Sequence, residues 1–147
     1  MFDSHQKTNK WLALATFFIS LVIYSLTMAP TASFWDAGEF IAVAHGLQVN
    51  HPPGAPFYSI LGRLFSMFMP KEYVAVSINF MSVLSSALTV MLLYLIVIRL
   101  IREFKPNVNE WASGDKIAHY GGALIGSLTF AVTDTFWFNA VEAEVYA

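Results

Sequence analysis

Residues 73–98, YVAVSINFMSVLSSALTVMLLYLIVI, contain no charged side chain. A helix of about 20 apolar residues crosses the hydrocarbon core of a bilayer, so this 26-residue run predicts a transmembrane helix. The run also carries small and polar side chains, namely Ser77, Asn79, Ser82, Ser85, Ser86 and Thr89. Such residues let helices approach closely in lipid, where apolar burial no longer distinguishes one surface from another. The run therefore predicts a helix that packs against other membrane helices.

Two further apolar segments predict spanning helices, at residues 11–28 and 117–138. The first could instead be a cleaved signal peptide, but the apolar region of a signal peptide is normally about 7–15 residues. Hydrophobic residues make up 56% of the chain and charged residues 12%, which fits a membrane protein. We expect an all-α, polytopic protein whose residues 1–147 form one membrane domain. Because Ala147 follows the third segment closely, we also expect more chain beyond it.

The connection between the first two predicted spans contains two short helices, over about residues 35–47 and 57–69. The sequence HPPGAP at residues 51–56 separates them, because proline restricts the backbone and glycine permits a reversal. Neither helix is long enough to cross a bilayer. Segments of this length lie in the membrane interface or re-enter it.

The distribution of Lys and Arg predicts the orientation. The N-terminal tail and residues 99–116 together hold six basic residues, whereas the connection at residues 30–73 holds two. Cytoplasmic loops are enriched in basic residues, so the N-terminus is predicted to be cytoplasmic and the connection to lie outside. The net charge of −2 argues against a nucleic-acid partner. The lack of cysteine excludes disulfides and thiolate chemistry.

The stretch SFWDAGEF at residues 33–40 places two carboxylates, Asp36 and Glu39, at the outer edge of the bilayer. In a helix this spacing puts both side chains on one face. Apolar surroundings raise the cost of charge, which is common at catalytic sites. The competing interpretation is a helix N-terminus, where Ser, Asp and first-turn acids are favoured. The residues themselves leave both interpretations open.

Other residues have weaker candidate roles. His51 could donate to a phosphate or could simply occupy a turn, and Arg63 could bind a lipid phosphate or anchor a helix. Glu142 and Glu144 could hold a divalent cation through oxygen ligands or could belong to a solvated loop. Asp134 lies within the third apolar segment and is a candidate functional residue, because a carboxylate inside a membrane is energetically unfavourable and is usually kept for a function.

This order of features resembles the entry module of membrane glycosyltransferases of the GT-C fold. Three stretches resemble, more narrowly, a bacterial family, formerly of unknown function, that is related to the animal plexin-type protein O-mannosyltransferases. The stretches are MAPT at 28–31 with FWDAGEF at 34–40, HPPGAP at 51–56, and FWFNAVEAEVY at 136–146. The resemblance extends from about Trp11 to the end of the chain.

The resemblance implies an enzyme of the bacterial inner membrane that takes a sugar from a polyprenyl-phosphate carrier. The sugar passes at the outer face to a hydroxyl of an exported protein. Asp36 corresponds to the first acid of the family's loop pair and would be the general base, with Glu39 orienting the acceptor. Glu142 and Glu144 lie where oligosaccharyltransferase relatives hold a metal, so Mg²⁺ or Mn²⁺ is a possible cofactor, although other relatives work without metal.

The sequence is also compatible with two other functions. A non-catalytic subunit packed within a larger membrane complex would also use the Ser-rich second span and the Gly122-x-x-x-Gly126 pattern. A transporter or lipid flippase would depend on Asp134 rather than Asp36, and it would need a polar path through the membrane. The central parts of the predicted spans are apolar apart from Ser, Thr and Asn79, which disfavours the transporter.

Overall fold

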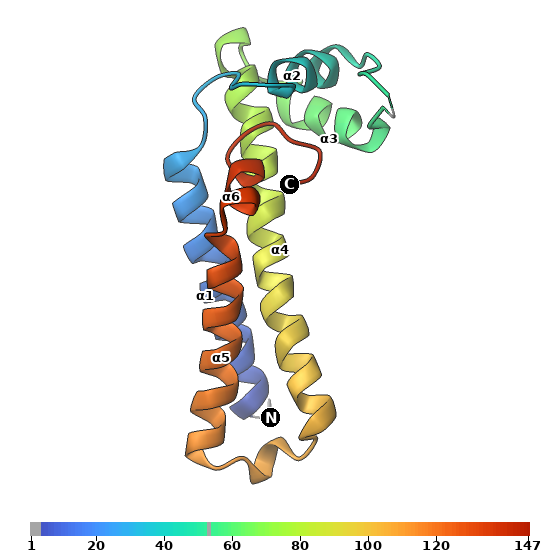
Figure 1. Cartoon of the computed structure of the whole chain (residues 1–147). Helices are drawn as coiled ribbons and strands as arrows, with labels where there is room; N and C mark the ends of the chain where they lie inside the picture. The colour runs from blue at the N-terminus through green and yellow to red at the C-terminus, as the bar shows by residue number, and fades with distance from the viewer. Residues whose placement is uncertain (1–3, 53) are drawn as a thin grey trace.

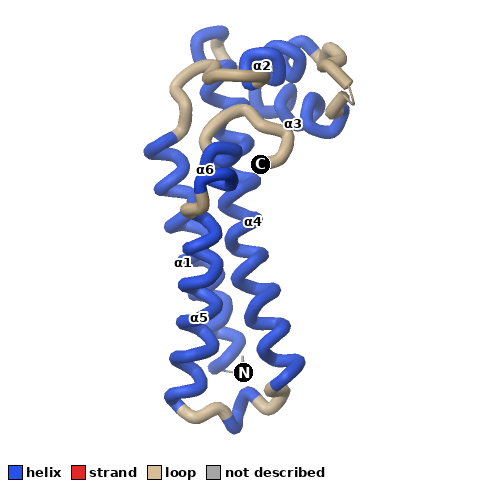
Figure 2. The backbone as a smooth tube through the Cα atoms, viewed as in Figure 1, coloured by secondary structure: helices blue, strands red, loops and turns tan. Residues whose placement is uncertain are grey.

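The computed structural model describes residues 4–52 and 54–147, and every regular element in these residues is a helix. Three long helices, α1, α4 and α5, lie side by side, with α4 running opposite to the other two (Figures 1 and 2). The elements are α1 (Ser4–Thr27), α2 (Ala37–Gly46), α3 (Pro56–Ser66), η1 (Lys71–Tyr73), α4 (Val74–Phe104), η2 (Val108–Glu110), α5 (Ser113–Ala131) and α6 (Asp134–Ala140). The all-α prediction is confirmed.

Two helical stretches, His5–Thr27 and Lys71–Phe104, are long and apolar enough to cross a membrane. They correspond to the first two predicted spans, and both helices extend beyond the charge-free runs. α4 continues past residue 98 through an amphipathic segment in which Arg99 pairs with Glu103 one turn later, with Nε 3.0 Å from Oε1.

The third predicted span is not one continuous helix. Residues 117–138 are divided between α5 and α6, because the helix ends at Ala131 and a new one begins at Asp134. α5 contacts α1 and α4 along the bundle but is not among the helices that reach the hydropathy of a membrane span. A Cβ atom added at Gly122 or Gly126 would meet nothing within 4 Å, so this face of α5 packs against no described residue.

Polar side chains of α4 hold the segments that leave the bundle. The Asn79 side-chain amide donates hydrogen bonds to the backbone carbonyls of Ala29 (2.8 Å) and Thr31 (3.1 Å), just after α1 ends. The Ser82 hydroxyl accepts a hydrogen bond from the backbone N–H of Glu144 (3.3 Å). Backbone groups without partners are costly away from water. These contacts therefore fix two loops against one helix.

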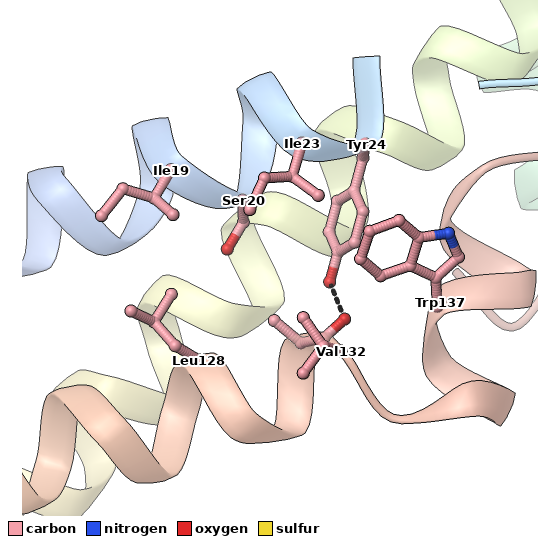
Figure 3. A pocket seen from close by; sticks show the side chains of 8 residues that line it. Ile19, Ser20, Ile23, Tyr24, Leu128, Val132 and Trp137 are labelled. Atoms are coloured by element: carbon pink, nitrogen blue, oxygen red, sulfur yellow. Dashed lines mark hydrogen bonds between the residues drawn. The ribbon is translucent and has the colours of Figure 1, made fainter. Parts of the chain in front are cut away.

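The break between α5 and α6 is held against α1. Tyr24 is fully buried, and its hydroxyl donates a hydrogen bond of 2.7 Å to the carbonyl of Ala131 (Figure 3). That carbonyl belongs to the end of α5, where the helix offers no backbone partner. The ring of Trp137 packs edge-on against Tyr24, with centroids 5.6 Å apart. An apolar cavity of about 130 Å³ lies beside them, lined from α1 by Ile19 and Ile23.

The helices α2 and α3 pack against each other and against the first turns of α4 (Figure 1). A Cβ atom added at Gly62 would lie 2.7 Å from the Cβ of Ala44, well inside the separation at which non-bonded carbons attract. The missing side chain at Gly62 therefore allows the two helices to meet. Phe40, Tyr58 and Ile78 fill the core between the three helices. This core fixes the start of α2, where the candidate acids lie.

Candidate functional site

The chain enters α2 through a strained backbone position at Trp35. Trp35 has a φ of 60°, a left-handed conformation that is costly for a bulky residue and is often found at functional sites. Asp36 then occupies the N-cap position, and its carbonyl accepts a 2.9 Å hydrogen bond from the N–H of Phe40. Its carboxylate makes no capping hydrogen bond. Asp36 is therefore placed at the helix start without serving as a side-chain cap.

Glu39, one turn later, holds His51 at two points. Glu39 Oε1 accepts the backbone N–H of His51 at 2.8 Å, and Oε2 lies 3.1 Å from His51 Nδ1. These backbone and side-chain hydrogen bonds lower the pKa of Glu39 below its usual 4.5. The hydrogen bond to Glu39 and the charge of this carboxylate raise the pKa of His51 above its usual 6.5. The contact thus favours an imidazolium beside a carboxylate.

Asp36 lies on the other side of the same imidazole. Its Oδ2 is 4.0 Å from His51 Nε2, which is close enough for charge attraction but too far for a hydrogen bond. Both side chains line a cavity of about 160 Å³ whose wall includes Glu144 and Tyr146. Two parts of the chain about a hundred residues apart in sequence therefore meet at this cavity.

The turn that carries His51 is closed by Asn50. The Asn50 side chain is buried, and its Oδ1 accepts the backbone N–H of Ala55 at 3.0 Å. Gly54 has a φ of 72°, which glycine adopts without steric cost. Pro53 lies outside the described residues. The sequence reasoning missed Asn50, although an Asn just before a Pro- and Gly-containing turn is a recognised signal for side-chain closure of the turn.

The two acids near the end of the chain contact different groups. Glu142 is buried and accepts a hydrogen bond from the hydroxyl of Ser33. Glu144 lines the cavity, and its Oε1 accepts the backbone N–H of Val145 at 2.8 Å. The structure therefore brings Glu144, rather than Glu142, to the side of Asp36 and His51.

Arg63 lies at the opposite end of α2 from Asp36. Its Nη1 donates a 2.6 Å hydrogen bond to the carbonyl of His45, in the last turn of α2. A helix of this length extends about 15 Å, so Arg63 and Asp36 belong to different places on the surface. Arg63 satisfies a carbonyl that the helix end leaves without a partner.

Tyr58 is a buried polar residue near the cavity that the sequence reasoning missed. Its hydroxyl has no hydrogen-bond partner among the described residues, and its ring packs on Phe40 with centroids 5.6 Å apart. Burial, assisted by the charge of Glu144, raises the pKa of Tyr58. No pattern in the sequence marks Tyr58, because its position depends on how α3 packs against α2.

Among the described residues, one group of ligand atoms could hold a cation: one atom each from Asp36, Glu39 and His51, all within 4.8 Å of one another. Two carboxylates and an imidazole suit Mn²⁺ better than Mg²⁺, which prefers oxygen ligands alone. A cation bound by all three would compete with the hydrogen bonds between Glu39 and His51. The observed contacts are those of an ion pair, and Glu142 and Glu144 lie outside this group.

Comparison with known proteins places this chain in a family by its sequence. The family model described as protein O-mannosyl-transferase TMEM260 N-terminal domain matches residues 36–147. The chain is 31% identical over 144 residues to the protein O-mannosyl-transferase tmem260 of Dictyostelium discoideum, covering 96% of this chain and 16% of that protein. It is 30% identical over 135 residues to the protein O-mannosyl-transferase TMEM260 of Mus musculus, covering 92% of this chain and 17% of that protein.

The chain thus spans about a sixth of the length of these relatives. No solved structure matches it significantly. The matched region begins at Asp36 and includes every residue that lines the cavity of about 160 Å³ beside Asp36 and His51. On the strength of this match over most of its length, the chain belongs to the family of the protein O-mannosyl-transferase TMEM260 N-terminal domain.

Proposed function

We propose that this chain supplies the acceptor-activating site of a membrane glycosyltransferase. The enzyme would transfer a sugar from a polyprenyl-phosphate carrier to a Ser or Thr hydroxyl of an exported protein. The name of the relatives, protein O-mannosyl-transferase, supports sugar transfer to protein. The two apolar helices support a membrane protein. From the resemblance to a bacterial family, we infer that the membrane is the bacterial cytoplasmic membrane. The distribution of Lys and Arg supports an orientation with the N-terminus inside and Asp36 outside.

The observation that carries this proposal is the placement of the Asp36 carboxylate. It stands at a helix start without a capping bond, lies 4.0 Å from His51, and lines a cavity. A general base must be able to reach the proton that it abstracts. With 61% of its side chain exposed, Asp36 can be reached by an acceptor hydroxyl from solution.

In the proposed step, one oxygen of Asp36 takes the proton of the acceptor hydroxyl while the acceptor oxygen bonds to the anomeric carbon of the sugar. The bond from that carbon to the carrier phosphate breaks, and the phosphate oxygen keeps the electron pair. Phosphate is a good leaving group, so the main requirement is a base for the hydroxyl.

Glu39 and His51 would place the carrier phosphate. Because His51 Nε2 is too far from Asp36 for a hydrogen bond, its N–H is available to a phosphate oxygen. Glu39 fixes the ring through Nδ1 and favours the charged form that binds a phosphate best. Arg63, at the other end of α2, would contact a lipid phosphate at the membrane surface.

The proposal is tested in the full-length protein by Asp36→Asn, with glycan attachment to exported proteins as the measurement. We expect a loss of about 10²–10⁴-fold, the usual contribution of a general base. Asn serves as well as Asp in a purely capping role, so expression and insertion should not change. Asp134→Asn is the matched control, because Asp134 is an exposed acid at the start of α6.

Normal glycosylation with Asp36→Asn would overturn the role of Asp36 and favour a non-catalytic subunit. Loss of activity with Asp134→Asn alone would favour a transporter. A cation is tested separately by adding EDTA to the purified full-length enzyme. If the imidazolium of His51 occupies the site, we expect the rate to stay unchanged. A loss that Mn²⁺ restores would instead assign Asp36, Glu39 and His51 to a metal.

A further inference from the structure

A second pocket lies at the other end of the bundle, between the first turns of α1 and the last turns of α4. Its volume is about 320 Å³, and the residues that line it include Lys10 and Arg102. This end holds the start of α1 and the end of α4, whereas α2 and α3 lie at the far end (Figure 1). The pocket is therefore remote from Asp36, and its role is independent of the proposed transfer reaction.

The two cations of this pocket, Lys10 and Arg102, have no partner among the described residues. Neither Lys10 nor Arg102 makes a hydrogen bond or an ion pair with any residue in the described ranges 4–52 and 54–147. At the same end, Arg99 pairs with Glu103, and Lys105 pairs with the Asp115 carboxylate at 3.3 Å. Lys7 and Lys116 also make no ion pair with a described residue, but they lie outside the pocket. No acidic side chain of residues 4–52 or 54–147 lines the pocket. Within this part of the chain, two positive charges thus face one space without a counter-charge.

The lining of the pocket changes from charged to apolar along the helices. Leu14 lies one turn after Lys10 on α1, and Leu95 and Met91 precede Arg102 on the facing side of α4. Spacings of four and seven residues keep these side chains on one helix face. The charged rim lies toward the helix ends, and the apolar floor lies toward the middle of the predicted spans. A bilayer has the same gradient, from phosphate to acyl chain.

Asn9 also lines the pocket. Its Oδ1 is shielded from solvent and accepts no hydrogen bond from a described residue.

We propose that this pocket binds the headgroup of an anionic phospholipid, with Lys10 and Arg102 contacting the phosphate and an acyl chain lying along Leu14, Met91 and Leu95. Charge complementarity selects an anionic lipid over a zwitterionic one, because the ammonium group of a zwitterionic lipid would face two cations. The apolar floor selects a lipid over a soluble phosphate. Basic pockets between transmembrane helices are known to bind such headgroups.

The test uses the full-length protein in detergent, with lipid retention measured by native mass spectrometry. The probes are palmitoyl-oleoyl phosphatidylglycerol and the corresponding phosphatidylcholine. The pocket variant is Lys10→Gln with Arg102→Gln. The control variant is Lys7→Gln with Lys116→Gln, which removes the same charge at the same end from exposed residues outside the pocket.

We expect the pocket variant to lose phosphatidylglycerol affinity by about tenfold or more, since each basic residue near a headgroup contributes a factor of about five. The control variant should stay within about twofold, and phosphatidylcholine should bind weakly to all forms. Circular dichroism on each variant checks that the helices are intact.

Three results would overturn the proposal. Equal losses in both variants would mean non-specific attraction to the charged end of the bundle. Equal retention of the two lipids would mean that charge does not select the ligand. Displacement of phosphatidylglycerol by millimolar inorganic phosphate would make the pocket a site for free anions.

Discussion

The candidate site and the pocket at the other end of the bundle hold their charges in opposite ways. At the α2–α3 end, His51 lies between Asp36 and Glu39, and each of these charges has an opposite charge within 4.0 Å. At the other end, Lys10 and Arg102 share a pocket and have no partner among the described residues. A site that acts on a neutral hydroxyl needs groups that hold one another in place. A site that receives an anion can leave its cations unpaired until the ligand arrives.

The two ends of the bundle are predicted to lie on opposite sides of the membrane, and a test of this orientation has the largest expected effect. The chain has no cysteine, so a single one can be introduced at Ala32 or at Ser113, which are both exposed. Ala32 lies between α1 and α2, and Ser113 begins α5, so the two positions lie at opposite ends of the bundle. We expect an impermeant thiol reagent on intact cells to label Ala32→Cys and to leave Ser113→Cys unlabelled until the membrane is permeabilised. Labelling of Ser113→Cys alone would reverse the orientation and place Asp36 in the cytoplasm.

The next largest effect is expected when the positive charge of His51, which lies between Asp36 and Glu39, is removed. His51→Gln keeps a hydrogen-bond donor but removes the imidazolium that would meet the carrier phosphate. Hydrogen bonds to charged groups contribute about 1.5–3 kcal/mol, so we expect kcat/KM for the donor to fall by about 10–100-fold. His119→Gln, on α5 at the far end of the bundle and outside both pockets, is the control. Unchanged donor kinetics in His51→Gln would remove His51 from the phosphate contact.

A substitution that disturbs the packing of α2 against α3 should have a smaller effect, mainly on the stability of the protein. Gly62→Ala places a methyl group 2.7 Å from the Cβ of Ala44, and overpacking of this kind costs about 1–3 kcal/mol. We expect a lower thermal transition of the full-length protein and weaker glycosylation, because α2 carries Asp36. Gly126→Ala, where the added Cβ meets open space, should be neutral or stabilising. Equal behaviour of the two variants would show that α2 and α3 tolerate separation.

The smallest effect is a shift in pH dependence. Because Glu39 raises the pKa of His51 above 6.5, the imidazolium and the activity that depends on it should be present at lower pH and be lost as pH rises through this raised value. Glu39→Gln removes the main cause, so the alkaline limb should move down toward 6.5. His51→Gln should lack that limb. Asp36 and Glu144 also face the cavity, so an unmoved limb in Glu39→Gln would assign it to another group.

The sequence predicted the first two long helices because charge-free runs of sufficient length have few alternatives in a membrane. The prediction of one continuous helix over residues 117–138 was wrong, because it followed the length of the apolar run and ignored a signal for a helix start within it. Thr133 and Asp134 form a typical helix start, with Thr at the N-cap and an acid in the first turn. The structure follows this signal, and α5 ends two residues earlier.

The candidate site was predictable in its residues and less so in its contacts. Asp36 and Glu39 share a helix face by simple spacing. The contact between Glu39 and His51 depends on the turn after α2, where Leu47 adopts a left-handed backbone. The choice of Glu144 over Glu142 at the cavity depends on Ser33 and Ser82, which lie far away in sequence. Spacing within one segment cannot specify such pairings.

Ser82 accepts a hydrogen bond from the backbone N–H of Glu144, and Glu144 lines the cavity beside Asp36. This wall of the cavity can therefore form only after residue 144 has been synthesised. Glu144 leaves the ribosome about a hundred residues after Asp36, which is on the order of 10 s at the usual rate of translation. During that interval Asp36 and His51 can meet on a growing chain that still lacks one cavity wall. Chains stalled before residue 144 should therefore contain the acid–histidine contact without a closed cavity, and protection of Asp36 from a carboxyl-modifying reagent would measure this. The order of synthesis thus predicts that the contacts of His51 with Asp36 and Glu39 can form before Glu144, which follows α6, completes the cavity wall.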